Sequence, residues 1–150
     1  MILAGHGLAL DLPDGWSGRV FSVQPAAATL HAANFPLPLD DGAFGDRSTA
    51  GMAPGMIFIA LTEYLVGGGL EPGEGLFAQR RAPRRLDPAT FRSTGLAHPR
   101  PGQAGTQRFF TAAGRPLCLY VVLAGPRRLR RGQLASVQHV LGGLEIAPRP

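Results

Sequence analysis

The sequence predicts an α+β fold, with a single twisted antiparallel β-sheet, a C-terminal amphipathic helix packed on it, and long loops rich in Gly, Pro and Arg. Short apolar runs separated by turn residues recur along the chain, which is typical of strands. Near the C-terminus, apolar residues recur at the three-and-four spacing of a helix. With 150 residues, 45% of them hydrophobic, the chain can bury a real core, so we expect one domain over residues 1–150.

The first half predicts four strands. Residues 7–12 alternate apolar and small side chains, and the following "PDG" predicts a turn into a second strand at 19–24, so the two are expected to form a hairpin. A third strand, 29–35, ends where two prolines deny donors to the ladder. The run "MIFIALTEY" at 56–64 predicts a strand whose two faces are both covered, because apolar residues point both ways.

The second half begins with a long irregular segment. Between residues 66 and 105 only "EGLFAQ" and "LDPATF" look capable of regular structure, so the segment is expected to be functional, mobile, or more structured than its pattern indicates. The stretch "TQRFFTAAGRPLCLYVVLAG" then predicts a strong hairpin. Its second strand should be central, because residues 117–123 are apolar on both faces.

The last element is a helix at about residues 132–142. Its expected apolar stripe is Leu134, Val137, Val140, Leu141 and Leu144. Gly142 and Gly143 are expected to supply a left-handed C-cap. Four arginines precede the helix, namely Arg127, Arg128, Arg130 and Arg131. Because positive charge opposes the macrodipole at a helix N-terminus, we expect them in the loop before the helix, where free backbone amides could help to receive an anion.

Charge is unevenly distributed along the chain. Residues 1–79 hold two arginines and eight acids, a net charge of −6, whereas residues 80–150 hold thirteen arginines and two acids, a net charge of +11. Such asymmetry indicates either a surface for an anionic partner or two halves that neutralise each other in the fold. The second interpretation is favoured, since the halves of a small domain interleave.

Composition also excludes several kinds of site. All fifteen basic residues are arginine, so the lysine-dependent P-loop, Schiff-base and protein-kinase chemistries are excluded. Cys118 is the only cysteine and is expected to be an inert packing residue. The N-terminus is a poor signal peptide and no apolar run is long enough for a membrane span, so we expect a cytoplasmic protein.

Catalytic and metal-binding residues are not expected. The four histidines lie far apart without a zinc-ligand spacing, so neither a metal nor a cofactor is predicted. His31 is expected to be a hydrogen-bonded interior residue and His139 to be solvated on the outer face of the helix. Adjacent Asp40 and Asp41 are expected to serve a turn. An enzyme using His31 or Asp40 is the third and least favoured hypothesis.

The chain resembles the PsbP-like/DcrB-like group of small α+β proteins. The resemblance is carried by "LALDLPDGWSGRV", by the late hairpin "FFTAAGRPLCLYVVLAG" and by the closing helix "LASVQHVLGGLEI", which together cover about half of the chain. It implies a twisted antiparallel sheet flanked by helices, and accessory work rather than catalysis, since members of the group bind other proteins as assembly factors, transport partners or chaperones.

These observations predict a non-catalytic, protein-binding accessory or chaperone-like module, with another protein as its partner and a homodimer as one arrangement. The alternative is a module for an anionic ligand, nucleic acid included, although nucleic acid is not the favoured partner. The candidate binding residues are the two arginine groups Arg80, Arg81, Arg84, Arg85 and Arg127, Arg128, Arg130, Arg131.

Overall fold

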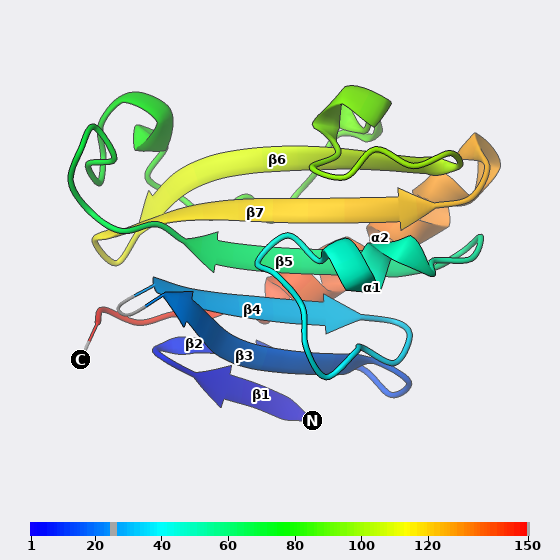
Figure 1. The fold of residues 1–150 in the computed structure, drawn as a ribbon, viewed down its shortest axis with the longest axis horizontal. Helices are drawn as coiled ribbons and strands as arrows, with labels where there is room; N and C mark the ends of the chain where they lie inside the picture. Colours follow the sequence, from blue (N-terminus) through cyan, green and yellow to red (C-terminus); the bar gives the residue numbers. More distant parts are fainter. Residues whose placement is uncertain (25–26, 150) are drawn as a thin grey trace.

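The computed structural model describes residues 1–24 and 27–149, and strands dominate them. The α+β class with antiparallel strands is confirmed, but the single sheet is wrong, because the strands form two sheets (Figure 1). The larger sheet has the order β3-β4-β5-β7-β6 and the smaller one β1-β2-β8. The strands are β1 (Ile2–Gly5), β2 (Leu8–Asp11), β3 (Ser17–Gln24), β4 (Ala27–Ala33), β5 (Ile57–Glu63), β6 (Gln103–Ala112), β7 (Arg115–Ala124) and β8 (Glu145–Ile146). The helices are α1 (Asp46–Ala50) and α2 (Arg130–Gly142), with 3-10 turns η1 (Gly75–Phe77), η2 (Pro88–Thr90), η3 (Ser93–Gly95) and η4 (Arg127–Leu129).

The expected hairpin between residues 7–12 and 19–24 is wrong. β2 pairs with β1 on one side and with β8 on the other, whereas β3 pairs with β4. The tight turn lies instead at His6 and Gly7, whose φ values of 50° and 78° are those of a hairpin turn that matches the twist of its strands. The sequence pattern does not predict β1, because the tetrapeptide "ILAG" is short and Gly7 fits the alternation of the strand that follows it.

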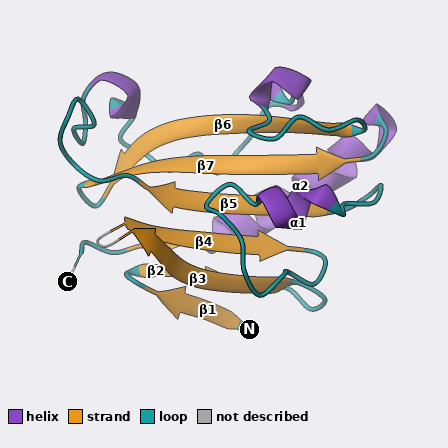
Figure 2. Cartoon of the chain, viewed as in Figure 1, coloured by secondary structure: helices purple, strands orange, loops and turns teal. Residues whose placement is uncertain are grey.

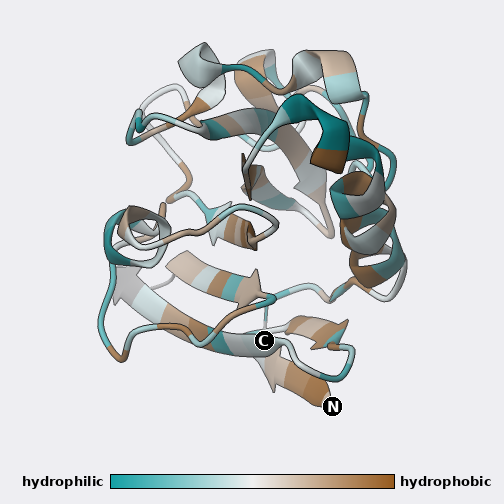
Figure 3. Ribbon diagram, turned by 90° about the vertical axis from the view of Figure 1, so that its right-hand side faces the viewer, coloured by the Kyte–Doolittle hydropathy of each residue, from teal (hydrophilic) through white to brown (hydrophobic). Residues whose placement is uncertain are grey.

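The large sheet is buried on both faces, as the apolar runs in β5 and β7 predict. Alternate residues of β5 point to opposite sides, with Ile57, Ile59 and Leu61 in one hydrophobic cluster and Phe58 and Ala60 in another. In Figure 3 the helix α2 and the small sheet cover one side of the large sheet, and the segment that contains α1 covers the other. β7 lies between β5 and β6, so its predicted central position is confirmed.

The segment between β5 and β6 has more structure than its pattern indicates. Figure 2 shows loops and short helical turns of this segment above β6, and residues 84–92 lie beside α2. Arg92 and Gly105 exchange backbone hydrogen bonds of 3.1 and 3.0 Å, and Thr111 donates its amide to the carbonyl of Gln79 at 2.7 Å. These contacts cover the outer edge of β6, which would otherwise present unpaired backbone groups to solvent.

Helix α2 packs on the sheet through the predicted stripe, all five members of which lie in the larger hydrophobic cluster. His139 is exposed, as expected. The helix begins at Arg130, two residues before the predicted start, and η4 precedes it, so Arg130 and Arg131 occupy its first turn rather than a loop. Exposed charge at this end costs only about 0.3 to 1 kcal/mol per residue. Packing of the apolar stripe compensates for a cost of that size.

The predicted left-handed glycine C-cap is also wrong, since Gly143 has a φ of −96°. The guanidinium of Arg84 takes its place, donating from Nη1 to the carbonyl of Leu141 at 2.6 Å and from Nη2 to that of Leu144 at 2.9 Å. The Leu141 carbonyl also accepts the amide of Leu144 at 3.1 Å, and the cation adds a second donor there and complements the helix dipole. Over residues 1–24 and 27–149, no helix has both the length and the apolar character needed to cross a membrane.

Candidate anion-binding site

Arginines from two separate segments meet in a pocket of about 500 Å³ at the start of α2. Pro126 leaves the sheet in an extended conformation, and η4 and the first turn of α2 follow it directly. On the other side of the pocket, η2 is held by the Asp87 side chain, which accepts a hydrogen bond from the amide of Ala89 at 2.9 Å. The pocket is lined by Pro88, Ala89, Phe91, Arg92, Arg127, Arg130 and Arg131.

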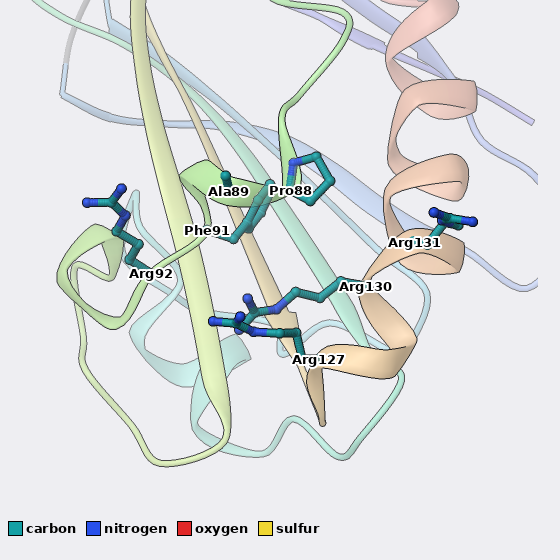
Figure 4. Close-up of a pocket in the computed structure, with 7 residues that line it drawn as sticks. All are labelled: Pro88, Ala89, Phe91, Arg92, Arg127, Arg130 and Arg131. Carbon is teal, nitrogen blue, oxygen red and sulfur yellow. The ribbon is translucent and has the colours of Figure 1, made fainter.

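Figure 4 shows that these arginines do not all point the same way. Arg127 and Arg130, three residues apart and therefore on one helical face, extend in the same direction below Phe91. Arg92 extends outward at the opposite rim, and Arg131 points away across the helix. Arg127 and Arg130 therefore form the floor of the candidate site, and Arg92 and Arg131 form its rim.

No carboxylate neutralises this site within the described part of the chain. The ion pairs among the described residues involve other cations, and none of these pairs includes an arginine that lines the pocket. Two guanidinium groups held on one face repel each other and create a positive potential. An anion between them would relieve the repulsion, and a guanidinium binds a phosphate or carboxylate through two parallel hydrogen bonds. The arrangement can therefore hold an anionic group.

The other predicted arginine group lines a second pocket, of about 580 Å³, near the C-terminal end of α2. Arg80, Arg81, Arg84 and Arg85 all line it, together with residues of the β6–β7 turn and β8. Two of the four also have structural contacts. Arg84 caps α2, and the guanidinium of Arg80 lies over Gly73, where a Cβ atom would come within 2.4 Å of Nη2.

The sequence prediction differs from the two pockets at two positions. Arg128 lies exposed in η4 and lines neither pocket. Arg92, which lines the first pocket, was not among the predicted residues. The position of Arg92 beside the pocket depends on its backbone bridge with Gly105 at the edge of β6. That contact joins distant residues, so it leaves no local signal in the sequence.

Among the described residues, the expected neutralisation between the two halves holds for three arginines. Arg100 pairs with Asp46 at 2.8 Å, and Arg115 and Arg149 both pair with the buried carboxylate of Glu63. These contacts link basic residues of the second half to acids of the first. For the two predicted groups, by contrast, no carboxylate partner lies among the described residues.

His31, which the least favoured hypothesis makes a catalytic residue, is buried and has structural contacts. The His31 ring is fully buried in β4 between the edges of Phe21 and Phe58, each 4.9 Å away, and its Nε2 lies 2.9 Å from the carbonyl of Ala43. Burial lowers the pKa of His31, despite that hydrogen bond. Asp40 is exposed.

Asp41 caps the first turn of α1 and the turn before it. Its carboxylate accepts hydrogen bonds from the amides of Gly42, Arg47 and Ser48 and from the Ser48 hydroxyl. Burial opposes ionisation of Asp41, but these hydrogen bonds outweigh it and lower the pKa of the carboxyl. The turn role expected for the aspartate pair therefore belongs to Asp41.

Cys118 is buried in β7, and burial raises the pKa of its thiol to about 12. A thiolate is required for nucleophilic chemistry, so a group with this pKa is unreactive at neutral pH.

Comparison with known proteins found no matching family model, curated protein or solved structure, and the resemblance to the PsbP-like/DcrB-like group stays a prediction.

Proposed function

We propose that the protein is a non-catalytic binding module that holds an anionic group of its partner in the arginine pocket at the start of α2. One observation carries the proposal: Arg127 and Arg130 extend together across the floor of a pocket that Arg92 and Arg131 border, and none of the four has a carboxylate partner among the described residues. The pocket volume of about 500 Å³ falls within the range of ligand sites in proteins.

The non-catalytic part of the proposal is supported by where the titratable groups lie. His31 is sealed between two phenylalanine rings, and the Asp41 carboxylate is occupied by four hydrogen-bond donors. The arginines of the pocket supply positive charge and donors but no general base, since a guanidinium stays protonated in proteins. A site of this composition suits binding rather than proton transfer.

Isothermal titration calorimetry with pyrophosphate tests the anion site. The wild-type chain should bind with a saturable isotherm, and the double variant Arg127→Ala/Arg130→Ala should lose most of the affinity, because both floor guanidiniums are gone. Arg47→Ala is the matched control, since Arg47 is exposed and lies outside both arginine pockets. An absence of binding, or an equal loss in the control, would refute the proposal.

A protein-binding accessory role is the second candidate, favoured by exposed apolar side chains. Leu65, Val66 and Leu76 are 44%, 61% and 57% exposed. Their two segments are joined by the rings of Tyr64 and Phe77, whose centroids lie 5.4 Å apart. Exposed apolar groups that gather in one region are typical of protein contact surfaces.

For this second role the partner is another protein, a second copy of the chain is the arrangement that can be tested first, and the cytoplasm is the expected location. Light scattering after size-exclusion chromatography should then show a concentration-dependent dimer. The variant Val66→Ser/Leu76→Ser should remain monomeric with an unchanged circular dichroism spectrum. A wild-type chain that stays monomeric at every concentration contradicts the homodimer, and cell fractionation tests the location.

A further inference from the structure

We infer that the two arginine groups act together as one surface for the phosphate backbone of a nucleic-acid duplex. The inference rests on the proposed anion-binding function, because the pocket at the start of α2 is one of the two ends of this surface. The other end is the pocket lined by Arg80, Arg81, Arg84 and Arg85. Eight arginines line the two pockets, of which Arg84 also caps α2 and Arg131 points away from the first pocket.

The chain between the two pockets runs alongside α2 in the opposite direction. Arg84 bonds to the carbonyls at the C-terminal end of α2, and the amide of Leu86 donates to the Gln138 side chain one turn earlier, at 3.1 Å. The segment then reaches η2 and Arg92, which line the pocket at the N-terminal end of α2. Residues 84–92 and α2 therefore form a continuous seam with an arginine group at each end.

The length of the seam suits a polymer with closely spaced charges. Helix α2 has 13 residues, and at 1.5 Å per residue it is about 20 Å long. Counting both strands, a duplex carries a phosphate about every 1.7 Å along the axis, so about twelve phosphates fall within this distance. The arginine groups at the two ends can therefore contact phosphates of different strands at the same time. An acidic peptide would need its carboxylates at two particular positions.

The chemistry of the seam favours a duplex backbone over unstacked bases. Guanidinium forks match phosphate oxygens in pairs, and no lysine is present to compete for this role. Residues 80–92 and 127–144 contain no Tyr or Trp, and their one Phe, Phe91, is buried, so exposed His139 is the one ring of these two segments on which a base could stack. Acids that lie in or beside the seam are Asp87, whose side chain holds η2, exposed Glu145, and exposed Asp11, which lies against Gly143 at the C-terminal end of α2.

Fluorescence anisotropy with the full chain tests the inference. The probe is a labelled duplex of about 15 base pairs, which is longer than the ~20 Å seam, prepared in two unrelated sequences. Single charge reversals probe each end, with Arg130→Glu at the start of α2 and Arg81→Glu at its C-terminal end. Arg47→Glu, outside the seam, is the matched control. Thermal unfolding shows that each variant is folded.

The two sequences should bind alike, with log affinity falling linearly against log salt. Each seam reversal should weaken binding about tenfold and flatten the salt slope by about one or more, and Arg47→Glu should do neither. The inference is overturned by a duplex affinity that Arg81→Glu leaves unchanged, by tighter binding of the single strand, or by equal binding of polyglutamate at the same salt.

Pyrophosphate binding separates this failure from that of the proposed function. Pyrophosphate binding that depends on Arg130, with no effect of Arg81→Glu on duplex affinity, would retain the anion pocket and remove the shared surface. A wild-type chain that binds neither pyrophosphate nor the duplex would contradict both the proposed anion-binding function and the shared duplex surface.

Discussion

The change Glu63→Gln should strongly destabilise the fold, because Glu63 holds a buried charge cluster together. Its side chain is 1% exposed, and its carboxylate accepts hydrogen bonds from Arg115 Nε and Nη2, both at 3.0 Å, and from Arg149 Nε at 2.8 Å. Arg115 also donates to the carbonyls of His6 and Ala147, so the cluster ties the first hairpin and the C-terminal segment to the large sheet.

Glutamine keeps the shape of Glu63 but leaves two guanidinium groups without a counterion. Breaking a buried ion pair from one side costs about 3 to 5 kcal/mol, a large part of the roughly 5 to 15 kcal/mol by which domains are stable. With an m-value of about 2 kcal/mol/M, the urea midpoint should fall by about 2 M. Urea titration followed by Trp16 fluorescence and by circular dichroism measures this shift.

The control for this variant is Glu74→Gln, which replaces an exposed carboxylate outside any ion pair of the described residues. It should change the free energy of unfolding by less than about 0.5 kcal/mol. Burial opposes ionisation of Glu63, but the hydrogen bonds from Arg115 and Arg149 outweigh it and lower the pKa of the carboxyl. Its contribution is therefore present above pH 4.5, the unfolded value, and is lost as pH falls through the folded pKa. A cost below about 1 kcal/mol for Glu63→Gln would refute this reasoning.

Three further predictions concern single side chains. Arg84→Ala should lower the free energy of unfolding by about 1 to 2 kcal/mol, because α2 loses its C-terminal cap. Arg85→Ala, in the same pocket, should have little effect on that free energy. Chemical denaturation compares the two variants, and equal losses of stability would exclude the capping role. Because burial lowers the pKa of His31 below 6.5, the unfolded chain binds a proton that the folded chain does not, so stability should fall as pH drops below 6.5 towards the folded pKa. Urea midpoints at several pH values should show this decrease in the wild-type chain and a smaller one in His31→Gln, and an equal decrease in both would contradict the assignment. The Cys118 thiol, with its pKa raised to about 12, should react with Ellman's reagent only in denaturant, and prompt labelling of the native chain would count against its burial.

Elements with a strong local pattern could be predicted from the sequence. The runs that became β5 and β7 are apolar on both faces, and the structure places both inside the sheet. The stripe of α2 was likewise readable, because its spacing directly reflects the face that packs on the sheet. The spacing of apolar residues in β5, β7 and α2 could be interpreted because it follows which side chains are buried in the fold.

The predicted late hairpin is confirmed, since β6 pairs with β7 across a short turn. Partners of strands that are distant in the sequence could not be predicted, because their pairing depends on contacts between distant residues. Leu8 in β2 pairs with Ile146 near the other end of the chain, a contact that no short pattern encodes. The cap of α2 was missed for the same reason, since Arg84 reaches the carbonyl of Leu141 across 57 positions of sequence. The glycines after the helix were the nearest local candidates, but the long-range cation took their place.

The candidate site could be predicted from the sequence only in part. The clusters around Arg81 and Arg130 were visible in the sequence as dense runs of charge. Their lack of carboxylate partners among the described residues, and the addition of Arg92 to the first pocket, depend on how the segment between β5 and β6 lies against β6 and α2. Composition indicates that charge is present, and only the fold decides whether it is neutralised.

The most direct test of the anion pocket is an NMR titration that follows the Nε–Hε signals of assigned arginines as pyrophosphate is added. The signals of Arg92, Arg127 and Arg130 should shift together and saturate, while that of Arg47 stays in place. Signals that do not move, or that all drift by the same amount without saturation, would contradict a binding site at the start of α2.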